Sequence, residues 1–149
     1  MKLDWGKGVL TINAPAAQGA SGNLASAGEI TLAGVILSIP LDVAHAVVIS
    51  LDGQPLATSK RMLLQVMTEE KPTGFRSESL GDRRHHITSI GENPWLVRKL
   101  AGVVRLRRAD AAKLKVTALD QFGQPTSTTQ TGDEIRLQPD TLYYSIEAP

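Results

Sequence analysis

The feature that most constrains this chain is a pair of apolar segments between residues 46 and 67. The first, residues 46–51, reads Ala-Val-Val-Ile-Ser-Leu, and the second, residues 61–67, reads Arg-Met-Leu-Leu-Gln-Val-Met. Val and Ile favour strands, and the Asp52-Gly53 pair suits a reversal of the chain. The intervening residues 54–60 lengthen the connection beyond two residues. We therefore predict a β-hairpin at the centre of a sheet.

Further apolar stretches, separated by turn residues, predict the other strands. One of them, residues 113–119, alternates Leu114, Val116 and Ala118 with polar side chains, which is typical of a strand with one buried and one solvated face. About nine or ten strands in 149 residues predict a single domain over residues 1–149, folded as an antiparallel β-sandwich. The remaining expected strands are residues 8–13, 30–39, 83–90, 102–107, 134–137 and 142–147.

Two stretches are expected to lack regular structure. Residues 16–28 hold three glycines within ten positions, which favours a surface loop over a helix. Residues 68–82 form the longest connection, of the kind that is often mobile or functional. Asn93-Pro94 is expected to turn the chain, and no segment has apolar residues at helical spacing over several turns.

The composition excludes several classes of partner. Sixteen basic and fifteen acidic side chains give a net charge of +1, which predicts no binding to nucleic acid and no attraction to an anionic membrane. No apolar run approaches the roughly 20 residues that span a bilayer. The absence of cysteine rules out disulfides and thiolate metal sites but does not fix a compartment. We expect no cofactor.

Residues of catalytic or metal-binding type do not form a familiar pattern. His85 and His86 are adjacent, so on a strand they point to opposite faces, and His45 belongs to a different strand. The acidic residues are scattered beside turns, and no Gly-x-Ser-x-Gly segment is present. The sequence therefore predicts no catalytic residue and no metal site, and a protein that is not itself an enzyme.

Four aromatic side chains are candidates for stacking on a sugar ring. They are Trp5, Trp95, Tyr143 and Phe75. A tryptophan offers a flat apolar face together with an N–H group, which suits a carbohydrate. Other roles stay open: Trp95 can instead cap the core, and Trp5 can pack against a neighbouring domain.

Three pieces of the sequence together resemble a known pattern. The first is Gly8-Val-Leu-Thr-Ile-Asn-Ala-Pro15 followed by Gln18-Gly19, and the second runs from Val48-Ile-Ser-Leu-Asp-Gly to Ser59 and into Arg61-Met-Leu-Leu64. The third is Thr73-Gly74, although Lys71-Pro72 just before it departs from the pattern. The pattern resembles the C-terminal all-β domain that follows the catalytic (β/α)8 barrel in some bacterial glycoside hydrolases, and it covers about half of the chain.

The resemblance implies a role and a partner. The chain would be the C-terminal part of a larger, secreted or periplasmic bacterial protein, packed on the catalytic barrel of the same parent chain and touching polysaccharide. The catalytic carboxylates of that family belong to the barrel, so no catalytic residue carries over. Two alternatives stay open: a stand-alone carbohydrate-binding module, and an immunoglobulin-like domain that binds protein.

Overall fold

The computed structural model describes residues 1–82 and 84–149 and shows an all-β protein, as predicted. The chain divides into two compact units. One contains residues 1–68 and 99–149, and the other contains residues 69–98. The sequence analysis treats residues 1–149 as one domain and does not anticipate the separate unit at residues 69–98.

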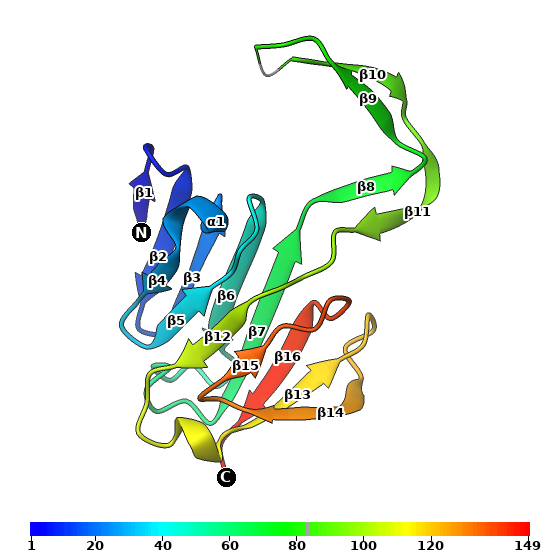
Figure 1. The fold of residues 1–149 in the computed structure, drawn as a ribbon. Helices are drawn as coiled ribbons and strands as arrows, with labels where there is room; N and C mark the ends of the chain where they lie inside the picture. The colour runs from blue at the N-terminus through cyan, green and yellow to red at the C-terminus, as the bar shows by residue number, and fades with distance from the viewer. Residues whose placement is uncertain (83) are drawn as a thin grey trace. The chain divides into compact units, whose positions relative to one another are not determined.

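The first unit is built on an eight-stranded antiparallel sheet with the order β1-β2-β3-β6-β7-β16-β13-β14 (Figure 1). The predicted hairpin forms its two central strands, in which Val48 lies opposite Leu64. Its central position, predicted from the apolar arms, is confirmed. The strands are β1 (Lys2–Asp4), β2 (Val9–Ala14), β3 (Ala17–Gly22), β6 (Ala44–Ser50), β7 (Arg61–Thr68), β16 (Tyr143–Glu147), β13 (Lys115–Leu119) and β14 (Pro125–Thr131).

A four-stranded antiparallel sheet with the order β15-β12-β5-β4 completes the sandwich. Residues 30–39, predicted as one strand region, form a hairpin instead, because residues 32–34 turn the chain and the Leu32 N–H donates to the Val35 carbonyl at 2.8 Å. The strands are β4 (Glu29–Thr31), β5 (Val35–Ser38), β12 (Val103–Leu106) and β15 (Ile135–Arg136).

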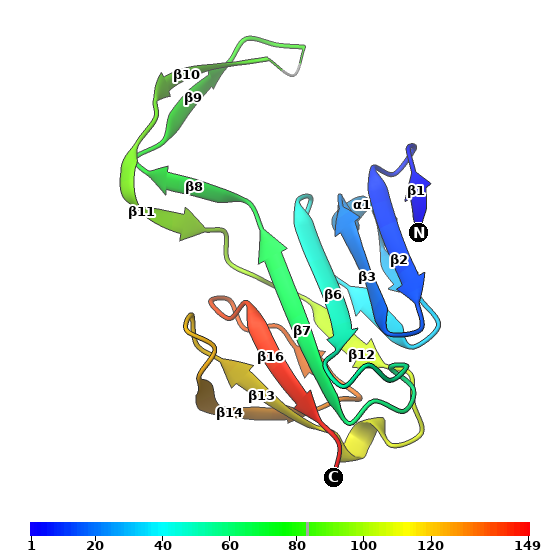
Figure 2. The same ribbon diagram turned by 180° about the vertical axis from the view of Figure 1, so that it is seen from behind.

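β12 of the smaller sheet lies behind β6 and β7 of the larger one (Figure 2). The core lies between the two sheets and draws side chains from both. Along β7, Met62, Leu64 and Val66 are buried, as period-two alternation requires. Val116 and Ala118 of β13 are buried as predicted. From β16, Tyr144 is fully buried, and its hydroxyl oxygen accepts a hydrogen bond from the Gln138 N–H at 2.7 Å.

The predicted surface loop over residues 16–28 is wrong. Residues 17–22 form β3, between β2 and β6, and α1 (Leu24–Ala27) follows with Leu24 in the core. A Cβ atom at Gly19 would lie 2.2 Å from the Ala46 carbonyl oxygen, so only glycine permits this approach of β3 to β6. The small residues that look like loop signals are the ones that let the strand enter the sheet.

Two edge strands of the large sheet also escape prediction. β14 follows a short turn after β13 and is almost wholly exposed, with a Ser- and Thr-rich sequence that shows no apolar alternation. At the other edge, β1 is three residues long and fully exposed. Besides α1, the helical segment η1 (Ala111–Lys113) precedes β13. Among the described residues, no helix is long and apolar enough to cross a membrane.

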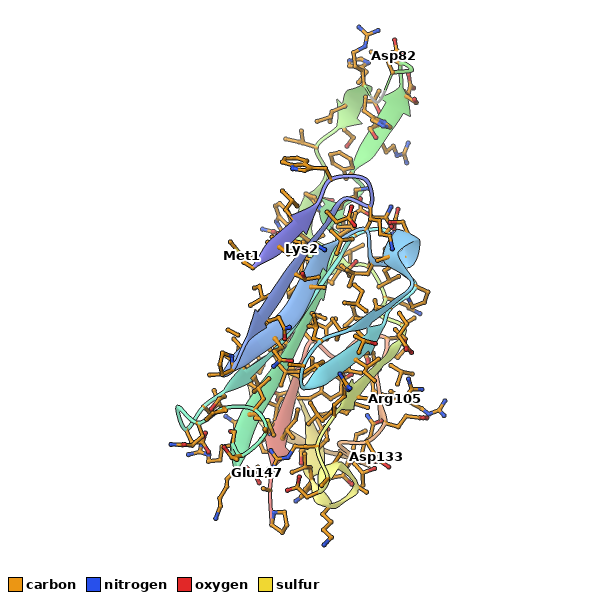
Figure 3. The ribbon with its side chains drawn as sticks, turned by 90° about the vertical axis from the view of Figure 1, so that its left-hand side faces the viewer. Met1, Lys2, Asp82, Arg105, Asp133 and Glu147 are labelled. Carbon is orange, nitrogen blue, oxygen red and sulfur yellow. The ribbon has the colours of Figure 1, made fainter. Side chains whose placement is uncertain are left out.

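The second unit consists of two short antiparallel ladders. β8 (Glu70–Thr73) pairs with β11 (Glu92–Val97), and β9 (Arg76–Ser79) pairs with β10 (His85–Ser89). Asp82, labelled in Figure 3, lies in the β9–β10 connection. No described residue of this unit is buried. Two-stranded ribbons of this kind are at best marginally stable in water, so the unit lacks the means to hold its shape by burial alone.

Two sequence predictions over this unit are wrong, and a third is confirmed. The unstructured connection predicted over residues 68–82 contains β8 and β9. Asn93-Pro94, predicted to turn the chain, lies within β11, where the register shifts and the peptide bond is cis. The strand predicted over residues 83–90 is found as β10, and position 83 itself lies outside the described residues.

Candidate functional site

The structure separates the four predicted carbohydrate-contacting residues into three places. Trp5 lies in the β1–β2 connection and is 86% exposed. Tyr143 is half-buried in β16, opposite Gln65 of β7. Phe75 and Trp95 both belong to residues 69–98 and line one groove there. Trp95 is 58% exposed and therefore does not cap the core.

The groove at Phe75 and Trp95 has a volume of about 460 Å³ and is formed entirely by residues 69–98. Pro72 lies opposite Trp95 in the β8–β11 ladder, so the two side chains are cross-strand neighbours. The Lys71 ammonium lies 5.7 Å from the centre of the Phe75 ring. We call this the aromatic groove; its lining residues are Pro72, Phe75, Ile90, Gly91, Glu92, Asn93 and Trp95.

Local hydrogen bonds fix the backbone around the aromatic groove. The Thr73 hydroxyl donates to the Pro94 carbonyl at 2.6 Å, and the Phe75 N–H donates to the Pro72 carbonyl at 3.1 Å. Gly91 has a φ of 70°, and a Cβ atom there would lie 2.5 Å from the Thr73 carbonyl oxygen. The chain therefore needs glycine at this position to close the groove.

A second candidate site, which the sequence analysis missed, is the outward face of the eight-stranded sheet. The inward side chains of β6 and β7 are in the core, yet the outward ones are also mostly apolar. His45 and Arg61 on this side are exposed, whereas the apolar side chains are half-buried, and no described strand of the first unit covers them. We call them the outer face: Leu10, Ile12, Val47, Ile49, Leu63, Met67, Leu119 and Tyr143.

Charge is distributed unevenly on this surface. The ladder register places Arg61, Glu147 and Lys115 side by side at one end of the strands, away from the middle of the outer face. Near the other end, the Ser21 hydroxyl lies 2.6 Å from Nδ1 of His45 and borders a hollow of about 230 Å³. The middle region carries no charged side chain, although Gln65 lies between Val47 and Tyr143, and a lack of charge is typical of the central part of a protein interface.

The opposite surface of the sandwich has a different character. Arg105 of β12 points away from the core (Figure 3), and its guanidinium lies 3.7 Å from carboxylate oxygens of Glu29 and of Glu134. The four-stranded sheet thus presents ion pairs to solvent, as expected for an ordinary exposed sheet face. The outer face of the larger sheet differs from this surface because its middle region carries no ion pairs.

The first two of the three motif pieces that carry the resemblance meet at the loop between β6 and β7. The Pro15 carbonyl accepts from the Leu56 N–H at 2.8 Å, and the Ala16 carbonyl accepts from the Ser50 N–H at 2.9 Å. Ser59 is fully buried, and its hydroxyl lies 2.8 Å from Oδ1 of Asp52. The Ser-Leu-Asp-Gly segment and the later Ser-x-Arg segment are therefore parts of one folded loop.

Arg108, which follows β12 of the smaller sheet, binds the same loop. Its Nη1 donates to the carbonyls of Leu56 at 2.9 Å and Ser59 at 2.8 Å, while Nε and Nη2 form a two-point ion pair with Asp110 at 2.6 and 2.8 Å. The Arg108 side chain is only 9% exposed. Because the guanidinium satisfies backbone carbonyls rather than facing an open site, this cluster is structural.

The Asp52 carboxylate should make the stability of this loop depend on pH. The Lys60 N–H and the hydroxyls of Ser50 and Ser59 donate to it and hold its pKa well below the ordinary value of 3.8. A lowered folded-state pKa contributes stability that is complete above the unfolded-state pKa and is lost as pH falls through the folded-state pKa. We expect Asp52→Asn to lower the Tm at pH 7, with the difference from the native chain narrowing below about pH 4. Thermal melts from pH 7 to 2 measure this, and a constant difference would contradict it.

The histidines and acids do not converge in the part of the chain that the structure describes. His85 and His86 are neighbours in β10 and both are exposed, whereas His45 lies in β6. Across residues 1–82 and 84–149, no group of three or more His, Asp or Glu side chains is placed to hold a metal ion. The geometry of the described residues therefore offers two surfaces for contact, the aromatic groove and the outer face.

No protein-family profile matches the chain, and no curated protein and no solved structure matches it.

Proposed function

We propose that this chain is a non-catalytic accessory domain of a glycoside hydrolase, which packs on the catalytic barrel of the same parent chain and contacts polysaccharide. The observation that carries the proposal is the uncovered outer face of the eight-stranded sheet. A strand whose inward and outward side chains are both apolar is typical of a sheet buried on both faces. β6 and β7 have this pattern, but only their inward side chains reach the core.

The size of the outer face favours a partner within the same polypeptide. It crosses six strands, from β2 to β13. At about 4.8 Å between strands, and with a length of about 17 Å along them, it covers roughly 400 Å². A contact would then bury roughly 800 Å² in total, which falls within the range of roughly 600–1,500 Å² for interfaces between domains of one chain.

The arrangement of the resemblance motifs supports the same role. The first two pieces build the loop that Arg108 and Asp52 hold together, and the third, Thr73-Gly74, forms the bend beside the aromatic groove. Each piece has a structural task, and none supplies an acid, a base or a nucleophile to a common centre. Motifs with structural tasks of this kind are expected in a domain that packs against a catalytic domain and takes no part in the reaction.

The coding sequence upstream of Met1 tests the proposal most directly. We expect it to encode a (β/α)8 barrel with two carboxylates at the carboxyl ends of its strands. The barrel and the present chain, expressed as separate polypeptides, should then copurify. Tandem β-domains upstream would instead favour an immunoglobulin-like protein-binding array, and a barrel that does not copurify would contradict the packing.

One observation favours a second candidate function, a carbohydrate-binding module that acts without a barrel. Such a module needs at least two accessible aromatic side chains along one surface. Phe75 and Trp95 meet this condition because they line the same groove. A native upstream sequence without any barrel, together with polysaccharide binding by the chain alone, would support the module over the accessory domain.

A further inference from the structure

The aromatic groove has the shape and chemistry of a platform for a ring. Trp95 and Pro72 are paired across the β8–β11 ladder, and Phe75 and Ile90 extend the apolar lining beyond them. Trp95 is 58% and Ile90 76% exposed, so both present their apolar surface to a ligand. An indole ring offers a flat face of high contact area to another flat apolar face.

Two polar residues also line this groove. Glu92 and Asn93 line the same groove, and neither side chain is hydrogen-bonded or ion-paired to another described residue. A carboxylate accepts hydrogen bonds only, whereas an amide both donates and accepts. Together they can satisfy hydroxyl groups, each of which donates one hydrogen bond and accepts others.

The charges of the unit point to a neutral ligand. Five basic and five acidic side chains occur in residues 69–98, so the formal charges cancel. An anionic polymer or an anionic membrane would need a basic excess. The ten are Lys71, Arg76, Arg83, Arg84, Arg98, Glu69, Glu70, Glu78, Asp82 and Glu92.

We propose that the aromatic groove binds a sugar residue of a neutral polysaccharide, with one ring face on Trp95 and Phe75 and its hydroxyls on Glu92 and Asn93. A pyranose ring has an apolar face of C–H groups and a rim of hydroxyls, which matches a lining that combines apolar side chains with Glu92 and Asn93. The hydrogen bond from the Thr73 hydroxyl to the Pro94 carbonyl joins the two strands beside the groove. The inference rests on the proposed function for its choice of polysaccharide as ligand.

Affinity electrophoresis of the 149-residue chain tests the inference. Native gels would contain soluble β-glucan, xylan, galactomannan or α-glucan, one polymer in each gel. We expect at least one polymer to retard the chain, with binding weakened at least tenfold by Trp95→Ala and less by Phe75→Ala or Glu92→Gln. Phe122→Ala removes an aromatic side chain that is 77% exposed outside the groove, and should leave retardation unchanged.

The outcomes separate this inference from the proposed function. No retardation by any polymer, or equal retardation of the native chain and Trp95→Ala, would overturn the sugar site while leaving an upstream barrel and its copurification intact. If Trp95→Ala keeps retardation but prevents copurification with the barrel, the groove is a protein-docking surface and the inference is wrong. Circular dichroism of each variant confirms that the fold is kept.

Discussion

Replacing Gly19 by alanine should destabilise the sandwich more than any change to an exposed glycine. A Cβ atom at this position would lie 2.2 Å from the Ala46 carbonyl oxygen and 2.7 Å from the Val47 Cα. Both obstacles are backbone atoms of the central strand β6, so no side-chain rotation can relieve the clash. We expect a loss of about 3 kcal/mol, at the upper end of the cost of overpacking, because β3 must shift away from β6. For a chain of this size the Tm should fall by roughly 10 °C.

Gly6→Ala provides the matched control. Its added Cβ atom would meet only the Asp4 carboxylate oxygen, at 3.5 Å, in an exposed turn. Urea unfolding followed by circular dichroism should place Gly6→Ala within about 0.5 kcal/mol of the native chain. Equal midpoints for the two alanine variants would show that β3 can move without cost, against the packing described here.

Gly19 also explains which part of the fold was hard to predict. The hairpin of β6 and β7 could be recognised because Val, Ile, Leu and Met carry a strong strand signal in its arms. β3 reads Ala-Gln-Gly-Ala-Ser-Gly, and its place in the sheet depends on close contact with β6, a tertiary feature that local composition does not reveal. Small residues were therefore interpreted as a loop.

The second unit was hard to predict for a related reason. Strands of a sandwich alternate buried and exposed side chains, whereas no described residue in residues 69–98 is buried. The groove pairs Trp95 with Pro72 across a ladder, so its residues are more than 20 positions apart in the sequence. Phe75 and Trp95 could be chosen as candidates by their chemistry. That they line one groove could not be predicted without knowing the pairing of β8 with β11.

The outer face could have been predicted in part. Val47 and Ile49, and likewise Leu63 and Met67, occupy the alternate positions of arms whose other positions form the core. A nearly continuous apolar run is the known signature of burial on both faces of a sheet. This run indicates a central position for the hairpin in its sheet. It also implies that a second surface covers the outward side chains of the hairpin.

Placing a charge in the middle of the outer face should release the domain from the barrel that we propose it rests on. Leu63 is half-buried and points away from the core, so Leu63→Glu leaves the core packing intact. In the complex, the same carboxylate would be buried against an apolar surface without a partner, which is strongly unfavourable. We expect binding to the separately expressed barrel to weaken at least a hundredfold, equivalent to about 2.8 kcal/mol. Isothermal titration calorimetry measures the change.

The control for this charge is Thr128→Glu in the edge strand β14, where the side chain is exposed. It adds the same carboxylate to the same sheet, but outside the outer face, and should bind the barrel as the native chain does. Leu63→Glu should also bind less of a hydrophobic dye than the native chain when the domain is alone, because it interrupts an uncovered apolar surface. Undiminished barrel binding by Leu63→Glu would mean that the partner covers another surface, and the apolar side chains of β6 and β7 would then need a different explanation.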